Sequence, residues 1–168
     1  MLLFLRKIAS KVITLCSAIE MEKIITSDSE NHVILRIPQV ASRTKNPNTL
    51  LNSFSNSILH TGKLKCYSNT TRNLIKDYHI LNVAEYIMSS NLKGIISFCS
   101  PYNYLPAEIA KAMSKVLDVE VEISVEVNGR PMNNFTLSSV LSSVSNSMFL
   151  AERDQYLYEV IEYAISEK

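Results

Sequence analysis

Glycine is scarce in this chain, with three residues among 168, at Gly62, Gly94 and Gly129. Glycine supplies the left-handed turns and the close backbone approaches that phosphate-binding loops need. No glycine-rich phosphate loop is present in the sequence. The shortage therefore argues against a nucleotide-dependent enzyme.

Cysteine and long apolar runs are also in short supply. The three cysteines, Cys16, Cys66 and Cys99, are widely spaced, which excludes a disulfide scaffold and a zinc finger and predicts buried thiols in a reducing compartment. No run of about 18 uncharged apolar residues occurs, so we expect no membrane span and no membrane partner. The apolar start of the chain precedes Arg6 and Lys7, the reverse of the order in a signal peptide. These features predict a cytoplasmic protein.

Recognisable catalytic and metal-binding patterns are missing as well. The three histidines lack the spacing of metal ligands, and no serine lies in a Gly-x-Ser-x-Gly elbow. We therefore expect no catalytic residue, no metal ion and no cofactor. The carboxylates of Glu120, Glu122 and Glu126 are interpreted as the solvent-exposed face of a strand. The alternative is a small nuclease or hydrolase in which Asp118, Glu120 or Glu122 meets a cation.

What the sequence does contain is enough apolar material, 46% of residues, for a core, and residues 1–168 are expected to form a single domain. Apolar spacing predicts helices over 2–25, from Pro47 to Gly62, over 80–92 and 106–117, and through most of the last third. Strands are expected over 32–37, 63–67 and 119–127, and a helical turn over 69–76. The pair Asn128–Gly129 after the last strand favours a hairpin. The predicted fold class is α+β, mostly helical with a small antiparallel β portion.

Charge is distributed unevenly along the chain. Residues 33–76 hold seven basic residues and no Asp or Glu, and residues 107–168 carry a net charge of −5. A basic region attracts polyanions by counterion release, so residues 31–76 form a predicted basic subregion. The expected nucleic-acid contacts are Arg36, Arg43, Lys45, Lys63, Lys65, Arg72 and Lys76. Phe54, Tyr67 and Tyr78 are candidate base-stacking residues, and Tyr67 is preferred to Phe54, which fits the buried face of its helix. The alternative is a solvated basic surface, or one that pairs with the acidic half.

A tyrosine-rich turn leads into an alanine-rich helix at residues 102–115, with the sequence Tyr-Asn-Tyr-Leu-Pro-Ala-Glu-Ile-Ala-Lys-Ala-Met-Ser-Lys. This segment resembles the small subunit of archaeal type I-A CRISPR effector complexes of the Cascade type. The resemblance covers about 14 of the 168 residues. It implies antiviral defence without catalysis, with other effector-complex protein subunits as partners and a role in holding guide RNA or displaced single-stranded DNA.

The expected function is therefore that of a non-catalytic, RNA- or DNA-binding complex subunit rather than an enzyme. The alternative is a protein-only adaptor or assembly factor of viral or mobile-element origin. In that case Tyr156, Tyr158 and Tyr163 would mediate partner binding or self-association, because tyrosine is favoured at interfaces.

Overall fold

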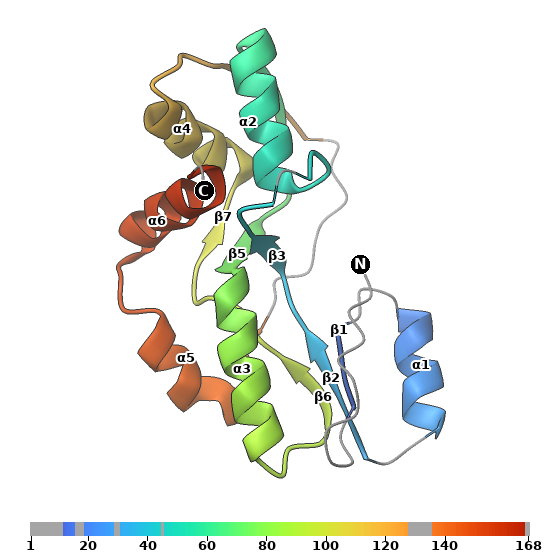
Figure 1. Cartoon of the computed structure of the whole chain (residues 1–168). Coiled ribbons are helices and arrows are strands. Elements are labelled where there is room, and N and C mark those ends of the chain that lie inside the picture. Colours follow the sequence, from blue (N-terminus) through green and yellow to red (C-terminus); the bar gives the residue numbers. More distant parts are fainter. Residues whose placement is uncertain (1–11, 16–18, 29–30, 45, 128–135, 167–168) are drawn as a thin grey trace.

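The computed structural model describes residues 12–15, 19–28, 31–44, 46–127 and 136–166. Its first sheet consists of three parallel strands in the order β1-β2-β6 (Figure 1). Their bounds are Val12–Leu15 for β1, His32–Arg36 for β2 and Gly94–Ser97 for β6. β2 is buried through Leu35. Burial on both faces is typical of parallel sheets, whose strands are covered by helices.

Two further sheets are separate from the first. In one, β5 (Arg72–Lys76) lies between β3 (Gln39–Ala41), which is parallel to it, and the antiparallel β7 (Asn103–Tyr104). In the other, β4 (Lys63–Tyr67) and β8 (Glu122–Glu126) form a parallel ribbon. Among the described strands, only the β5–β7 pairing is antiparallel. The fold is therefore α/β.

Helices cover these sheets on several sides (Figure 1). Helix α1 contacts β2, α3 contacts β5, and α2, α4 and α6 pack against one another next to β4 and β5. Their bounds are Ile19–Asp28 for α1, Leu50–Thr61 for α2, Asp77–Ser89 for α3, Pro106–Leu117 for α4, Ser142–Met148 for α5 and Arg153–Ile165 for α6, with a 3₁₀ turn η1 at Ser139–Leu141.

Local sequence signals explain where two of these helices begin and end. Helix α2 stops at Gly62, whose φ of 63° is the left-handed conformation that glycine adopts without a steric penalty. Helix α4 starts at Pro106, and the Glu108 carboxylate accepts a hydrogen bond from the Leu105 backbone N–H. Both boundaries agree with the sequence-based expectation.

Tyrosine hydroxyls tie the loop between α5 and α6 to the sheet. Tyr102 and Tyr104 donate hydrogen bonds to the carbonyl oxygens of Ala151 and Arg153, at 2.9 and 2.7 Å. Tyr156 of α6 donates to the carbonyl oxygen of Leu74 in β5, at 3.2 Å. Buried hydroxyls need such partners, so these bonds position α6 over the end of β5.

The structure corrects several expectations. The α+β fold class with an antiparallel β portion is wrong, because all the described strand pairings except β5–β7 are parallel. The single helix over 2–25 is wrong, since β1 occupies Val12–Leu15, and the helical turn over 69–76 is instead β5. The expected hairpin at 128–129 lies outside the described residues. The expected buried face of β8 is also wrong, because Ile123 is only half-buried and Val125 is 55% exposed.

No helix among the described residues is long and apolar enough to cross a membrane.

Candidate functional site

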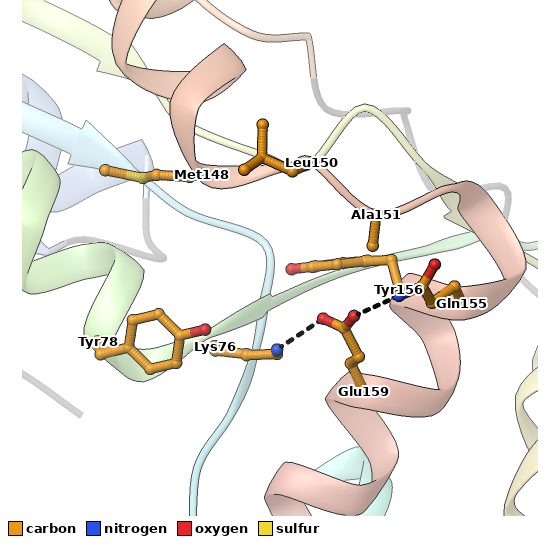
Figure 2. A pocket seen from close by; sticks show the side chains of 8 residues that line it. All are labelled: Lys76, Tyr78, Met148, Leu150, Ala151, Gln155, Tyr156 and Glu159. Atoms are coloured by element: carbon orange, nitrogen blue, oxygen red, sulfur yellow. Dashed lines mark hydrogen bonds and ion pairs between the residues drawn. The ribbon is translucent and has the colours of Figure 1, made fainter.

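A pocket of about 290 Å³ opens where β5 ends and α3 begins, beneath the loop that joins α5 to α6 (Figure 2). Its lining residues come from these three places and from α6: Lys76, Tyr78, Met148, Leu150, Ala151, Gln155, Tyr156 and Glu159. The carboxyl end of a parallel strand is where α/β folds commonly place a ligand. We therefore take this pocket as the candidate functional site.

An ion pair lies along one wall of the pocket. The Lys76 Nζ is 3.2 Å from Glu159 Oε2, and Gln155 Nε2 donates to the other carboxylate oxygen, also at 3.2 Å (Figure 2). The Lys76 side chain is only 10% exposed, whereas that of Glu159 is 39% exposed. The pair therefore presents a charged acceptor to the opening and keeps its charged donor inside.

Aromatic rings flank the same lysine. The Lys76 ammonium lies 5.8 Å from the ring centroid of Tyr78 and 5.7 Å from that of Tyr156, within the range of cation–π attraction. Tyr156 is buried, whereas Tyr78 is exposed. The Tyr78 ring therefore offers an accessible aromatic surface beside a fixed positive charge, and Met148, Leu150 and Ala151 supply an apolar wall opposite.

A buried aromatic cluster supports the pocket from behind. His79 contacts the rings of Tyr78 and Phe149 edge-on, with centroids 4.4 and 5.0 Å away, and stacks on Tyr156 at 6.4 Å. His79 is 2% exposed, and its Nδ1 has no hydrogen-bond partner among the described atoms. Burial and the nearby Lys76 charge lower the pKa of His79 to about 4, against a partly offsetting effect of Asp77. His79 is therefore neutral at pH 7 and packs as an aromatic ring.

One exposed cation lies next to this cluster. The Arg43 guanidinium lies over the ring of Tyr163, 4.7 Å from its centroid, and Tyr163 packs edge-on against Tyr78. The Tyr163 hydroxyl donates to Asp77, and burial raises the pKa of that hydroxyl to about 12. No ion pair holds Arg43 within the described part of the chain. Its charge is thus available to an anion near the pocket.

A second hollow, of about 550 Å³, lies beside β8 and is lined by Gly62, Ser114, Val121 and the carboxylates of Glu120 and Glu122. The Glu122 carboxylate is paired with Lys63 at 2.9 Å. No group of three or more potential metal ligands occurs among the described residues. This hollow has neither buried charge nor an aromatic wall, so it is the weaker candidate.

The residues predicted to contact nucleic acid are distributed over several elements. Arg36 forms an ion pair with Glu22, Lys63 with Glu122, Lys65 with Glu126 and Lys76 with Glu159. Arg43 lies on Tyr163, Tyr67 is exposed on β4, Arg72 begins β5 and is half-buried, and Lys45 lies outside the described residues. Of the described residues of this set, Lys76 and the stacking candidate Tyr78 line the candidate pocket, and Arg43 lies near it. Their role in nucleic-acid binding stays a prediction.

Sequence reasoning missed Glu159 and Gln155, and it assigned Tyr156 to an interface rather than to a pocket wall. These residues lie about 80 positions from Lys76, and no motif connects the two segments. The sequence signal that could have found them is weak: Gln155 and Glu159 are four residues apart on one helix face.

No family model matches the sequence, and no curated protein matches it. Solved structures do match in fold. One is a UDP-N-acetylglucosamine 4-epimerase from Methanobrevibacter ruminantium, with a TM-score of 0.63, 20% identity and coverage of 86% of this chain and 50% of that chain. Another is a dTDP-4-dehydrorhamnose reductase from Bacillus anthracis in complex with NADP, with a TM-score of 0.66, 12% identity and coverage of 85% and 50%.

A third match is a UDP-glucose 4-epimerase from Thermus thermophilus in complex with NAD, with a TM-score of 0.66, 12% identity and coverage of 86% and 51%. The chain thus spans about half the length of these structures. The matches overturn the resemblance to a CRISPR small subunit, and with it the expectation of a non-catalytic nucleic-acid-binding subunit in antiviral defence. They also speak against the alternative of a protein-only adaptor or assembly factor of viral or mobile-element origin. The same matches contradict the expectation that the protein is not an enzyme.

The residues that the structure describes do not form the glycine-containing turn of a dinucleotide site. Such a site needs glycines where a strand turns into a helix, so that the backbone can approach the pyrophosphate. Gly62 instead joins α2 to β4, Gly94 begins β6, and Gly129 lies outside the described residues. At the junction from β5 to α3, the first turn of the helix begins with Asp77 and Tyr78 and contains no glycine. The chain therefore shares its fold with about half of each of these structures, and in the part of the chain that the structure describes no strand-to-helix turn carries a glycine.

Proposed function

We propose that this chain is the sugar-nucleotide-binding half of an NAD(P)-dependent enzyme that modifies a sugar nucleotide by epimerisation, dehydration or reduction. One observation carries the proposal: 85–86% of the chain shares its fold with about half of several enzymes whose names specify sugar nucleotides. The sequence has no glycine-rich strand-to-helix turn, so the dinucleotide needs a different polypeptide segment. This supports the assignment of substrate binding, rather than cofactor binding, to this chain.

The role assigned to this chain is to bind and orient the substrate. The tyrosine bonds to Ala151 and Arg153 hold the loop over the pocket, and the Lys76–Glu159 pair fixes a donor and an acceptor in one place. Such a fixed arrangement lowers the entropic cost of positioning a substrate for reaction. NAD(P), when bound to the complementary half, would supply hydride transfer. A cytoplasmic location also belongs to this proposal, and the free thiols of Cys66 and Cys99 support it.

The proposal is tested by thermal unfolding of the full chain with a panel of ligands. UDP-N-acetylglucosamine, UDP-glucose and dTDP-glucose represent the sugar nucleotides, and NAD, NADP and NADPH represent the cofactors. We expect at least one sugar nucleotide to raise the Tm in a concentration-dependent manner, because a ligand that binds only the native state stabilises it. The cofactors should leave the Tm unchanged.

Two outcomes would contradict the proposal. One is a panel in which no sugar nucleotide shifts the Tm at millimolar concentration. The other is stabilisation by NADPH as large as that by any sugar nucleotide, which would place a dinucleotide site in this chain.

A further inference from the structure

We propose that the pocket between Tyr78 and Glu159 binds the hexose ring of the sugar nucleotide and that Arg43 contacts its diphosphate. This assignment rests on the proposed function and specifies which part of the ligand each surface takes. Three features of the pocket support it: its size, its mixture of charges and its aromatic wall.

The size of the pocket limits what can enter it. A cavity of about 290 Å³ lies at the lower end of the range that holds small ligands, roughly 300–1,000 Å³. One ring-sized group fits this space, whereas a whole sugar nucleotide or a dinucleotide does not. The rest of such a ligand must therefore lie outside the pocket.

The charges of the pocket favour a neutral polyhydroxylated group over an ion. The Lys76 ammonium and the Glu159 carboxylate are 3.2 Å apart, so the pair has little net charge to attract a phosphate or a metal ion. A hydroxyl can accept a hydrogen bond from a lysine and donate one to a carboxylate. Two neighbouring hydroxyls of a hexose therefore satisfy both members of the pair, and Gln155 adds an amide at the same place.

The aromatic wall suits the other face of a sugar ring. Tyr78 is exposed and is held by His79 on one side and Tyr163 on the other, so its ring is fixed before any ligand arrives. The C–H groups on one face of a hexose form an apolar surface that packs on such a ring, while Leu150 lies across the opening (Figure 2).

Arg43 determines the orientation of the ligand in this proposal. Its guanidinium stacks on Tyr163, which contacts Tyr78, so a hexose at Tyr78 places the attached diphosphate on the side of Arg43. Guanidinium binds phosphate oxygens through paired N–H groups. The neighbouring carboxylate of Asp77 accepts a hydrogen bond from the Tyr163 hydroxyl, so Arg43 is the group on this side that can attract the diphosphate.

The test is isothermal titration of the full chain with UDP-N-acetylglucosamine and dTDP-glucose, and with UDP and dTDP alone. In Tyr78→Leu and Glu159→Gln we expect the Kd for the sugar nucleotide that binds to rise about tenfold, which corresponds to the loss of one good contact. Leu81→Ala on α3 and Glu162→Gln on α6 are matched controls, because both side chains are exposed and lie outside the pocket. They should change the Kd less than about twofold.

Two further variants keep the test independent of folding defects. Ala151→Leu adds bulk to the mouth of the pocket without removing the Ala151 carbonyl that accepts from Tyr102, and we expect the same weakening. Arg43→Gln should weaken sugar nucleotides and free UDP or dTDP alike, and it should reduce the salt dependence of binding. Unfolding curves for each variant show whether it is folded at the titration temperature.

The possible results distinguish a failure of the hexose assignment from a failure of the proposed function. If sugar nucleotides bind the wild type and all pocket variants equally, the hexose assignment is wrong and the proposed function stands. If UDP or dTDP alone loses as much affinity as the sugar nucleotide in Tyr78→Leu, the pocket holds the base and the assignment is overturned. If no sugar nucleotide binds the wild type, the proposed function fails, and the assignment fails with it.

Discussion

Lys76 and Lys63 belong to the same basic segment, yet their ion pairs lie in opposite surroundings. The Lys76 side chain is 10% exposed and lies between two tyrosine rings, with Glu159 as its partner. Lys63 and Glu122 are each 71% exposed on the β4–β8 ribbon. Exposed pairs contribute little because water and salt screen them, whereas a buried charge is costly without its partner. A basic segment in a sequence therefore does not define one basic surface.

The largest difference between the two regions should appear on removing a tyrosine. Tyr156→Ala in the pocket wall should lower the free energy of unfolding by about 3–5 kcal/mol, because it leaves a cavity in the core. Tyr67→Ala on the exposed ribbon should cost less than about 1 kcal/mol. Urea unfolding of both variants measures the two costs. Equal losses would show that the pocket region is no better packed than the ribbon.

Acid should act on the pocket region through His79. Burial and the nearby Lys76 charge lower its pKa from the ordinary value of 6.5 to about 4 in the folded state, so protonation favours the unfolded chain. The stabilisation is complete above about pH 6.5 and is lost as the pH falls toward 4. The expected loss is about 3 kcal/mol across that window. His79→Phe should remove this part of the acid-induced loss of stability.

The measurement is urea unfolding of wild type and His79→Phe at pH 7 and pH 4.5. The comparison between the two proteins cancels the carboxylates that titrate in both. A wild-type curve that falls no more steeply than that of the variant would contradict the assignment of a neutral, buried His79.

The two ion pairs should show the smallest effects and the clearest contrast. Lys76→Met should lower stability by about 1–2 kcal/mol, a value discounted because Glu159 is partly exposed. Lys63→Met should change stability by less than about 0.5 kcal/mol, and 1 M salt should abolish even that. Equal costs for the two substitutions, measured by urea unfolding at low and high salt, would remove the distinction between the regions.

Local signals in the sequence predicted some elements well. Gly62 ends α2, Pro106 begins α4, and the strand at His32–Arg36 is read from its apolar run. Each of these depends on residues that are close in sequence. The helical turn expected over 69–76 failed because Leu74 and Ile75 are buried by β3 and by α6, which come from distant parts of the chain.

Strand pairing and the pocket could not be predicted from local sequence signals. β8 pairs with β4, which lies more than fifty residues earlier, so a hairpin signal after β8 says nothing about its partner. Lys76 was singled out for its charge, but its neighbours Gln155 and Glu159 come from the last helix. The sequence analysis therefore identified the charged residue and assigned it to an open surface, because only the tertiary fold places it in a pocket.

The most direct test of this account is a crystal structure of the chain with UDP-N-acetylglucosamine or dTDP-glucose. The account predicts the hexose against the Tyr78 ring, with hydroxyls bonded to Lys76 and Glu159 and the diphosphate toward Arg43. A sugar nucleotide bound elsewhere, with the pocket empty, would contradict it.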